Sequence, residues 1–290
     1  MPTPSLEQLR SCLLDISQPI AQRTHAAFIL RTKGDLDCVN IICDAIRNKQ
    51  DSALMRHELA YVLGQIQNPV VCPLLESVLC DETDDILVRH ESAEALGAIG
   101  LPDSLPVLEK FVNHEAPEIS ETCQIAVDLI KWRKSGEGVG KSSYLSVDPA
   151  PAFQKSEKSV EELKSILLDP SSSLFHRYRA MFSLRNMNTD DAALALVAGF
   201  QDASALFRHE VAYVLGQMQR LVTVPGLTDV LRTEAEHRMV RHEAAEALGA
   251  IGGEEVEKIL AEYIDDKEMV VQESCHVALD TIEYWSAANF

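Results

Sequence analysis

The sequence repeats itself, and this repetition is what most constrains the fold. Residues 54–67 (LMRHELAYVLGQIQ) match residues 206–219 (LFRHEVAYVLGQMQ) at eleven of fourteen positions. Residues 88–100 match residues 240–252 at twelve of thirteen positions, again at an offset of 152. Matches of this length at one fixed offset indicate that the chain consists of two related halves.

A shorter period lies within each half. The tripeptide Arg-His-Glu occurs twice in each half, and its two histidines are 33 residues apart. Around the first copy, Leu59, Val62 and Ile66 follow helical spacing, and Asn68-Pro69 then signals a turn. Strand signals are nearly absent. A period of a little over 30 residues, built from paired helices, is typical of an α-solenoid with a continuous core.

We therefore predict an all-α fold with four helical pairs in each half. The N-terminal half is expected to span residues 1–133 and the C-terminal half residues 158–290. Residues 134–157 are dense in glycine, serine and proline, so we expect them to form a linker. A linker of this length allows the second half to face the first about a pseudo-two-fold axis, with a metal site between them.

Composition narrows the class of protein. The net charge of −19 argues against a protein that binds nucleic acid through its phosphates, and it favours a cationic substrate or partner. No stretch is long and apolar enough to span a membrane, and the N-terminus has no signal-peptide pattern. The seven cysteines form no C-x-x-C pair, so we read them as reduced thiols of a cytosolic protein.

The Arg-His-Glu motifs lie at the start of the second helix of their pairs. Stacked helices are about 8–10 Å apart, so equivalent histidines of adjacent repeats should lie side by side. Imidazole and carboxylate ligands with open positions are typical of non-haem iron sites. We expect two metals, and the candidate ligands are His57, Glu58, His90, Glu91, His209, Glu210, His242 and Glu243.

The glutamates of the motifs need not all have the same role. Adjacent helical residues point about 100° apart, so the His and the Glu of one motif can serve different purposes. The most symmetric assignment gives each half one metal, held by His57, His90 and Glu91 or by His209, His242 and Glu243. Metals that act together would lie about 3.5–4 Å apart. Glu58 and Glu210 are then left to contact substrate.

Other chemistries have less support. Zinc also binds His and Glu, but the H-E-x-x-H pattern of zinc proteases is absent. There is no nucleophile elbow, Walker loop or G-x-G-x-x-G. Packing and ion pairing within a repeat consensus would explain the recurring Arg and Gly. They would not explain why the tripeptide Arg-His-Glu occurs in four repeats and is absent from the other four.

At these motifs the chain resembles deoxyhypusine hydroxylase, a family of HEAT-repeat enzymes. The resemblance rests on the four His-Glu pairs, the YVLGQ and EALGAIG stretches and the duplication around a linker, and it covers essentially the whole chain. It implies an α-solenoid of HEAT-like repeats. It also implies a di-iron monooxygenase that uses dioxygen to convert a deoxyhypusine residue of eukaryotic translation initiation factor 5A to hypusine.

The resemblance implies roles and partners as well. Two Fe²⁺ ions would be held by the four histidines with Glu91 and Glu243, while Glu58 and Glu210 would receive the substrate amines. Dioxygen would be the co-substrate, and an external electron donor is required. The partner would be the deoxyhypusine form of the initiation factor, with neither nucleic acid nor membrane. We expect a monomer in the cytoplasm, with the nucleus as a further location.

Two other functions are also compatible with the sequence. A non-enzymatic HEAT scaffold would bind a protein along its concave face and would contain no stoichiometric metal. A bilin lyase-like HEAT protein shares the E-A-A-x-A-L-G consensus and would bind a tetrapyrrole, but it gives no reason for paired His-Glu motifs. Metal analysis separates both from the hydroxylase.

Overall fold

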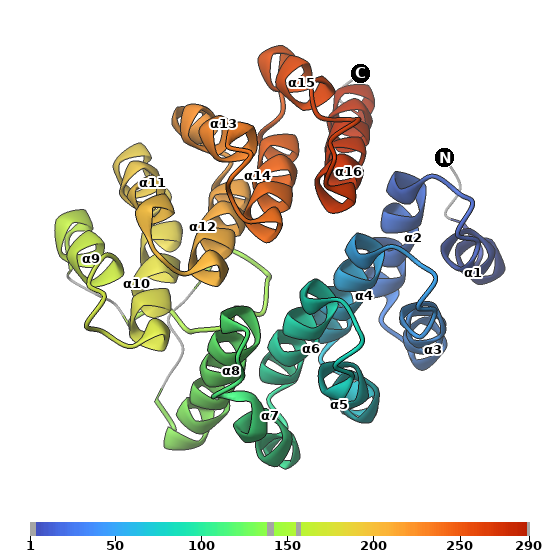
Figure 1. Ribbon diagram of the computed structural model, residues 1–290, viewed down its shortest axis with the longest axis horizontal. Coiled ribbons are helices and arrows are strands. Elements are labelled where there is room, and N and C mark those ends of the chain that lie inside the picture. Colours follow the sequence, from blue (N-terminus) through green and yellow to red (C-terminus); the bar gives the residue numbers. More distant parts are fainter. Residues whose placement is uncertain (1–3, 138–141, 155–157, 289–290) are drawn as a thin grey trace. The chain divides into compact units, whose positions relative to one another are not determined.

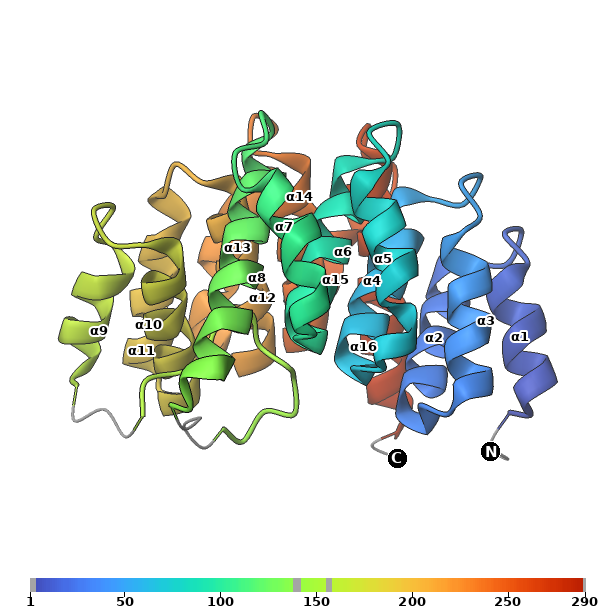
Figure 2. The same cartoon turned by 90° about the horizontal axis from the view of Figure 1, so that it is seen from below.

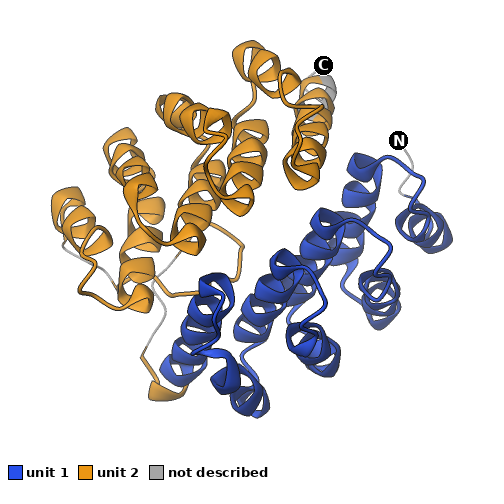
Figure 3. Cartoon of the chain, viewed as in Figure 1, with its two compact units in different colours: residues 1–133 blue, residues 134–290 orange. Residues whose placement is uncertain are grey.

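The computed structural model describes residues 4–137, 142–154 and 158–288, and within these ranges every regular element is a helix. The chain divides into two compact units, Met1–Arg133 and Lys134–Phe290, which Figure 3 shows in different colours. The expected all-α class is therefore confirmed.

Each unit contains four helical pairs, labelled in Figure 1. The helices of the first unit are α1 (Leu6–Leu14), α2 (Ile20–Lys33), α3 (Leu36–Ile46), α4 (Ala53–Ile66), α5 (Cys72–Cys80), α6 (Ile86–Ile99), α7 (Leu105–Phe111) and α8 (Pro117–Ser135). Those of the second unit are α9 (Val160–Leu167), α10 (Leu174–Met187), α11 (Asp190–Val197), α12 (Ala205–Met218), α13 (Val224–Arg232), α14 (Arg238–Ile251), α15 (Glu254–Ala261) and α16 (Met269–Ala288). Short 3₁₀ turns precede or follow several of them: η1 (Pro69–Val71), η2 (Pro102–Ser104), η3 (Ala198–Gln201) and η4 (Leu221–Thr223).

The helices of each unit form two rows. The second helices of the pairs pack against one another in sequence, α2 on α4 and α4 on α6 in the first unit, and α12 on α14 and α14 on α16 in the second. The first helices form the other row; Figure 1 shows the two rows of each unit nearly end-on, and Figure 2 shows the helices from the side. Stacking of this kind buries the apolar stripe that no single helical pair can bury alone.

Local sequence signals fix the ends of the helices that carry the motifs. The side chains of Ser52, Asp85 and Ser204 accept hydrogen bonds from backbone N–H groups in the first turns of α4, α6 and α12. At the other end, Gly100 follows α6 with a φ of 75°, a left-handed conformation that glycine adopts without strain. These caps place each motif within the first two turns of its helix.

Small residues set the distance between the helices of the second row. A Cβ atom added to Gly64 would lie 2.8 Å from Cα of Ala95, and one added to Gly216 would lie 2.9 Å from Cα of Ala247. Real Cβ atoms do not approach a backbone this closely. The recurring glycines thus allow α4 to contact α6, and α12 to contact α14, at close range.

In α4, α6 and α14 a buried arginine joins the motif helix to the preceding helix of its pair. Arg56 donates from Nε to the carbonyl of Ile46, at the end of α3, and pairs with both oxygens of Asp84 at 2.5 and 2.6 Å. Arg241 repeats this arrangement, with the carbonyl of Leu231 and the carboxylate of Asp266. Because this side chain is buried and bonded on both sides, it fixes the rotation of the helix that carries it.

Part of the segment expected to be a linker is packed against the second unit. Arg185 is fully buried, and its guanidinium binds both carboxylate oxygens of Asp148, at 2.7 and 2.6 Å. The same group lies 4.4 Å from the ring centroid of Tyr144. Residues 138–141 and 155–157 of the expected linker lie outside the described residues. The described residues 142–154 are thus held by α10 instead of forming a free connection.

Two expectations from composition concern the whole chain. All seven cysteines are free thiols, in agreement with the reading from their spacing. Among the described residues, no helix combines the length and the apolar character needed to cross a bilayer.

The glycine contacts lead to a prediction about stability. Gly249→Ala in α14 would place a Cβ atom 2.7 Å from Cα of Ala278 in α16. Alanine is favoured over glycine inside a helix by about 1 kcal/mol, but overpacking against a backbone costs about 1–3 kcal/mol. We expect a net loss of stability, measured as a lower urea midpoint and a lower melting temperature.

Gly226→Ala in α13 is the matched control, because its added Cβ atom would meet only side-chain atoms of Val197 and no backbone atom. A side chain gives way more easily than a backbone, so the control should lose less stability than the Gly249 variant. Equal stability of the Gly249 variant and the wild type would show that α14 and α16 can separate at no cost.

Candidate metal centre

The four motif histidines occupy one place in the repeat. Each is the fifth residue of its helix, and in α4, α6 and α14 the arginine before it donates to a carbonyl at the end of the preceding helix of the pair. The histidine and the glutamate that follow therefore lie on the part of the helix that meets the next repeat. Figure 1 shows the helices concerned, α4 next to α6 in the first unit and α12 next to α14 in the second.

In the first unit, His57 and His90 lie side by side, with ring centroids 5.4 Å apart. His57 Nε2 is 3.3 Å from a carboxylate oxygen of Glu91, which belongs to the neighbouring helix. Its other ring nitrogen, Nδ1, is 3.2 Å from Glu58 Oε1. One imidazole is thus held between two carboxylates, and a second imidazole lies next to it.

The second unit repeats this geometry. The rings of His209 and His242 are 5.3 Å apart, and His209 Nε2 lies 3.3 Å from Glu243 Oε2. Ligand atoms of His209, His242 and Glu243 all lie within 4.8 Å of one another. Imidazole and carboxylate ligands bind a metal at about 2.0–2.2 Å, so the ligand atoms around one ion lie within roughly 4.4 Å of each other. Small side-chain movements would therefore suffice to bind an ion.

Burial makes this donor set unusual. The four motif histidines are at most 5% exposed and the four motif glutamates at most 8%. Buried acids and imidazoles in such numbers are costly unless they are paired with one another or bind a cation. Two imidazoles and one carboxylate in each unit match the ligand set of a divalent transition metal, and the residues present fit such an ion.

The electrostatics of His57 agree with a site for a cation. Burial alone would lower the pKa of this imidazole, but the carboxylates of Glu58 and Glu91 raise the pKa well above its usual value. In the absence of a metal, a proton is therefore held between these carboxylates. A positive charge at this position is stabilised by the protein, whether a proton or a metal ion provides it.

The structure corrects one geometric expectation. Neighbouring residues of a helix were expected to point apart, so that the His and Glu of one motif would not meet. The contact between His57 Nδ1 and Glu58 Oε1 shows that the long glutamate side chain bends back to its neighbour. Glu210, the equivalent residue of the second unit, is 2% exposed.

The structure also shows the contacts of the motif arginines, of Tyr213 and of the pair His114-Glu115. The four motif arginines make structural contacts: Arg56, Arg208 and Arg241 form ion pairs with Asp84, Glu236 and Asp266, and Arg89 donates to the carbonyl of Leu79. Tyr213 accepts a hydrogen bond from Gln217 in its own helix. A fifth His-Glu pair, His114-Glu115, lies outside the motifs: His114 accepts a hydrogen bond from the backbone of Ala116, and Glu115 is exposed.

One residue near the candidate ligands of the second unit was not identified from the sequence. Ser274, in α16, is fully buried and donates to Glu246 Oε1 at 2.8 Å. The same carboxylate oxygen lies 3.5 Å from His242 Nδ1. No signal in the sequence links a serine to a glutamate 28 positions earlier, except that both lie in equivalent turns of neighbouring repeats.

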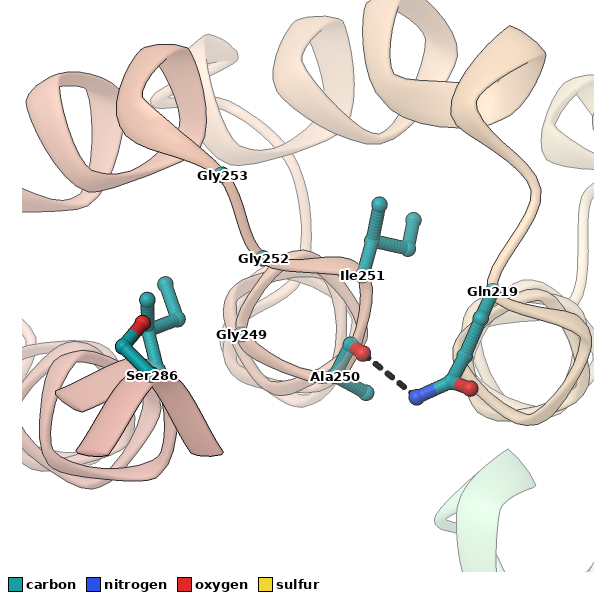
Figure 4. Close-up of a pocket in the computed structure, with 8 residues that line it drawn as sticks. Gln219, Gly249, Ala250, Ile251, Gly252, Gly253 and Ser286 are labelled. Carbon is teal, nitrogen blue, oxygen red and sulfur yellow. Dashed lines mark hydrogen bonds between the residues drawn. The ribbon is translucent and has the colours of Figure 1, made fainter. Parts of the chain in front are cut away.

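A separate pocket lies away from these residues, at the C-terminal end of α14 (Figure 4). It has a volume of about 420 Å³, and Gln219, at its edge, donates to the carbonyl of Ala250 at 2.6 Å. At the equivalent place in the first unit, Arg133 binds the carbonyls of Gly97 and Ala98. None of the motif residues lines the pocket.

Comparison with known proteins assigns the repeat type. The family model for HEAT repeats matches residues 55–127 and 195–280, and the model for the PBS lyase HEAT-like repeat matches residues 177–202. The fold class predicted from the repeats is therefore confirmed at the level of the HEAT family.

Curated proteins and a solved structure are similar over almost the whole chain. The deoxyhypusine hydroxylase of Danio rerio is 48% identical over 285 residues, covering 97% of this chain and 92% of the relative. That of Mus musculus is 47% identical over 287 residues, covering 98% and 94%. The structure of human deoxyhypusine hydroxylase in complex with glycerol matches with a TM-score of 0.92 and 46% identity, covering 96% of both chains. The chain belongs to the deoxyhypusine hydroxylase family.

Proposed function

We propose that this protein is a deoxyhypusine monooxygenase, which hydroxylates the deoxyhypusine residue of eukaryotic translation initiation factor 5A to give hypusine. The observation that carries the proposal is the duplicated set of buried ligands, two imidazoles and a carboxylate in each unit, in a chain similar to these hydroxylases over nearly its full length.

Each unit would hold one iron ion. His57, His90 and Glu91 are the proposed ligands in the first unit, and His209, His242 and Glu243 those in the second. The short contacts of His57 Nε2 to Glu91 and of His209 Nε2 to Glu243 support the choice of these two glutamates. Iron bound there would supply the redox chemistry with dioxygen that attack on an unactivated C–H bond requires, whereas zinc has no redox chemistry.

The protein's own residues would bind and orient the substrate. The arm of a deoxyhypusine residue carries amines that are cationic at neutral pH, so carboxylates are suitable partners for it. Glu58 lies next to His57, and Glu210 occupies the equivalent position of the second unit. We propose that these two carboxylates accept hydrogen bonds from the substrate amines and so bring the carbon to be hydroxylated close to the iron.

The charge of the chain supports a cationic substrate. Its net charge of −19 would speed association with a protein that presents a positively charged side chain, and would weaken this association at high salt. The substrate would be a protein, because the modified residue belongs to a polypeptide.

The direct test is reconstitution with Fe²⁺, a reductant and dioxygen, followed by mass spectrometry of the deoxyhypusine form of the initiation factor. We expect about two irons per chain and a gain of one oxygen atom on the modified residue. An iron-loaded protein that leaves this residue unchanged would overturn the proposed reaction. A protein that takes up no iron would favour a scaffold.

Single ligands can be tested through iron content. His57→Ala and His242→Ala each remove one proposed ligand, so each variant should lose iron and lose activity at least 100-fold. His114→Ala is the matched control, because this histidine also precedes a glutamate but lies outside the ligand sets. Wild-type iron content in both ligand variants would refute the assignment.

The two kinds of glutamate should differ in their effects. Glu91→Ala is expected to reduce iron content, because it removes a ligand. Glu58→Ala should retain most of the iron and raise KM for the protein substrate about tenfold or more, since a charge-assisted hydrogen bond contributes about 1.5–3 kcal/mol. Iron analysis and steady-state kinetics would distinguish them, and a reversed pattern would exchange their roles.

Iron should also stabilise the fold. A ligand that binds only the folded state stabilises it by about 2.7 kcal/mol at a free concentration of 100 Kd. The melting temperature of the anaerobic protein should therefore rise with Fe²⁺ and fall again when a chelator is added. Equal melting temperatures with and without iron would argue against a structured iron site.

A further inference from the structure

A chain of contacts leads from α16 to the imidazole of His242. Ser274 donates to Glu246 Oε1 at 2.8 Å, and the same oxygen lies 3.5 Å from His242 Nδ1. Glu246 follows His242 by one helical turn, so the two side chains lie over the same face of α14. Ser274 comes from the neighbouring helix and is fully buried.

The contact involves a particular ring nitrogen. Because Glu246 approaches Nδ1, the nitrogen that remains for a metal is Nε2. Metal-binding histidines commonly donate their second N–H group to a carboxylate, which fixes the tautomer and the orientation of the ring and makes it a stronger ligand. Glu246 is placed for this role, and Ser274 limits its freedom to rotate away.

The first unit differs at the equivalent positions. Thr122 corresponds to Ser274, but its hydroxyl donates to the carbonyl of Glu118 in its own helix, at 2.7 Å. Glu94 corresponds to Glu246, and it offers an oxygen that lies within 4.8 Å of ligand atoms of His90 and Glu91. In the first unit the carboxylate is therefore grouped with potential ligands, whereas in the second a hydroxyl holds it beside the histidine.

We propose that Glu246 is a positioning residue for His242, held in place by Ser274, and that it raises the affinity of the second unit for its metal. This inference rests on the proposed function only in requiring a metal at His242. It also implies that the two units are not equivalent, because the serine that holds the carboxylate is present in one of them alone.

The packing of α14 on α16 gives no separate reason for this arrangement. That contact is made by Gly249 and Ala278, one turn further along α14. The side chain of Glu246 is 23% exposed, so burial does not force it into its position. A structural role for Glu246 would therefore show itself in the stability of the metal-free protein, and a positioning role in metal binding.

The test measures Fe²⁺ affinity by anaerobic competition with a chelator, using the full-length protein. Glu246→Ala should weaken binding at one of two sites by about 10–100-fold, the usual effect of removing such a partner. Glu246→Gln should restore part of the affinity, because the amide oxygen can still accept from Nδ1–H. Ser274→Ala should have a smaller effect in the same direction.

Thr122→Ala is the matched control, since its hydroxyl is bonded within its own helix, and it should leave both affinities unchanged. Melting temperatures of the metal-free variants should equal that of the wild type. If Glu246→Ala lowers this temperature, the iron affinities of Ser274→Ala and Glu246→Gln show whether Glu246 acts on the metal site. Wild-type iron affinity in these variants would overturn the inference.

The inference and the proposed function can fail separately. A protein that binds two irons and leaves deoxyhypusine unmodified refutes the proposed reaction, while the affinities of the variants still judge the role of Glu246. A protein that hydroxylates deoxyhypusine, with variants that bind iron as the wild type does, refutes only the role of Glu246. A wild type that binds no iron refutes both.

Discussion

The structure depends on a buried arginine that comes directly before three of the four motif histidines, at Arg56, Arg89 and Arg241. Arg56 and Arg241 each bind a carbonyl at the end of the preceding helix and a carboxylate in the turn between the two helices of the next repeat. Breaking a buried pair of this kind by removing one partner costs about 3–5 kcal/mol. The arginine thus fixes the rotation of its helix, and with it the direction of the ligands that follow in the sequence.

Much of this organisation could be predicted from the sequence, because it repeats. Periodicity gave the helices, the duplication gave the four pairs per half, and the recurrence of His-Glu identified the eight candidate ligands. The bend of Glu58 toward His57 was not predicted, since it depends on side-chain torsions that helical geometry leaves open. The ion pairs of the arginines were expected, but their partners lie 25–28 residues away and only the fold identifies them.

Duplication has preserved the inner ligand sets more closely than their surroundings. The separations of the paired imidazoles agree to 0.1 Å, at 5.4 and 5.3 Å, and both units place a glutamate 3.3 Å from Nε2 of the first histidine. Behind these sets, a threonine bonded to its own helix in one unit corresponds to a serine bonded to a carboxylate in the other. Two sites of the same composition can therefore differ in how firmly their histidines are held.

The glycine–alanine contacts set the distance between the helices that carry the proposed ligands. The helices that meet at Gly64 and Ala95 also carry His57 and His90, and those that meet at Gly216 carry the second histidine pair. The space between two imidazoles is therefore determined by the smallest side chains of the repeat. A substitution that separates these helices would therefore also separate the histidines that we propose as metal ligands. The stability of the fold and the geometry of the proposed metal site thus depend on the same few atoms.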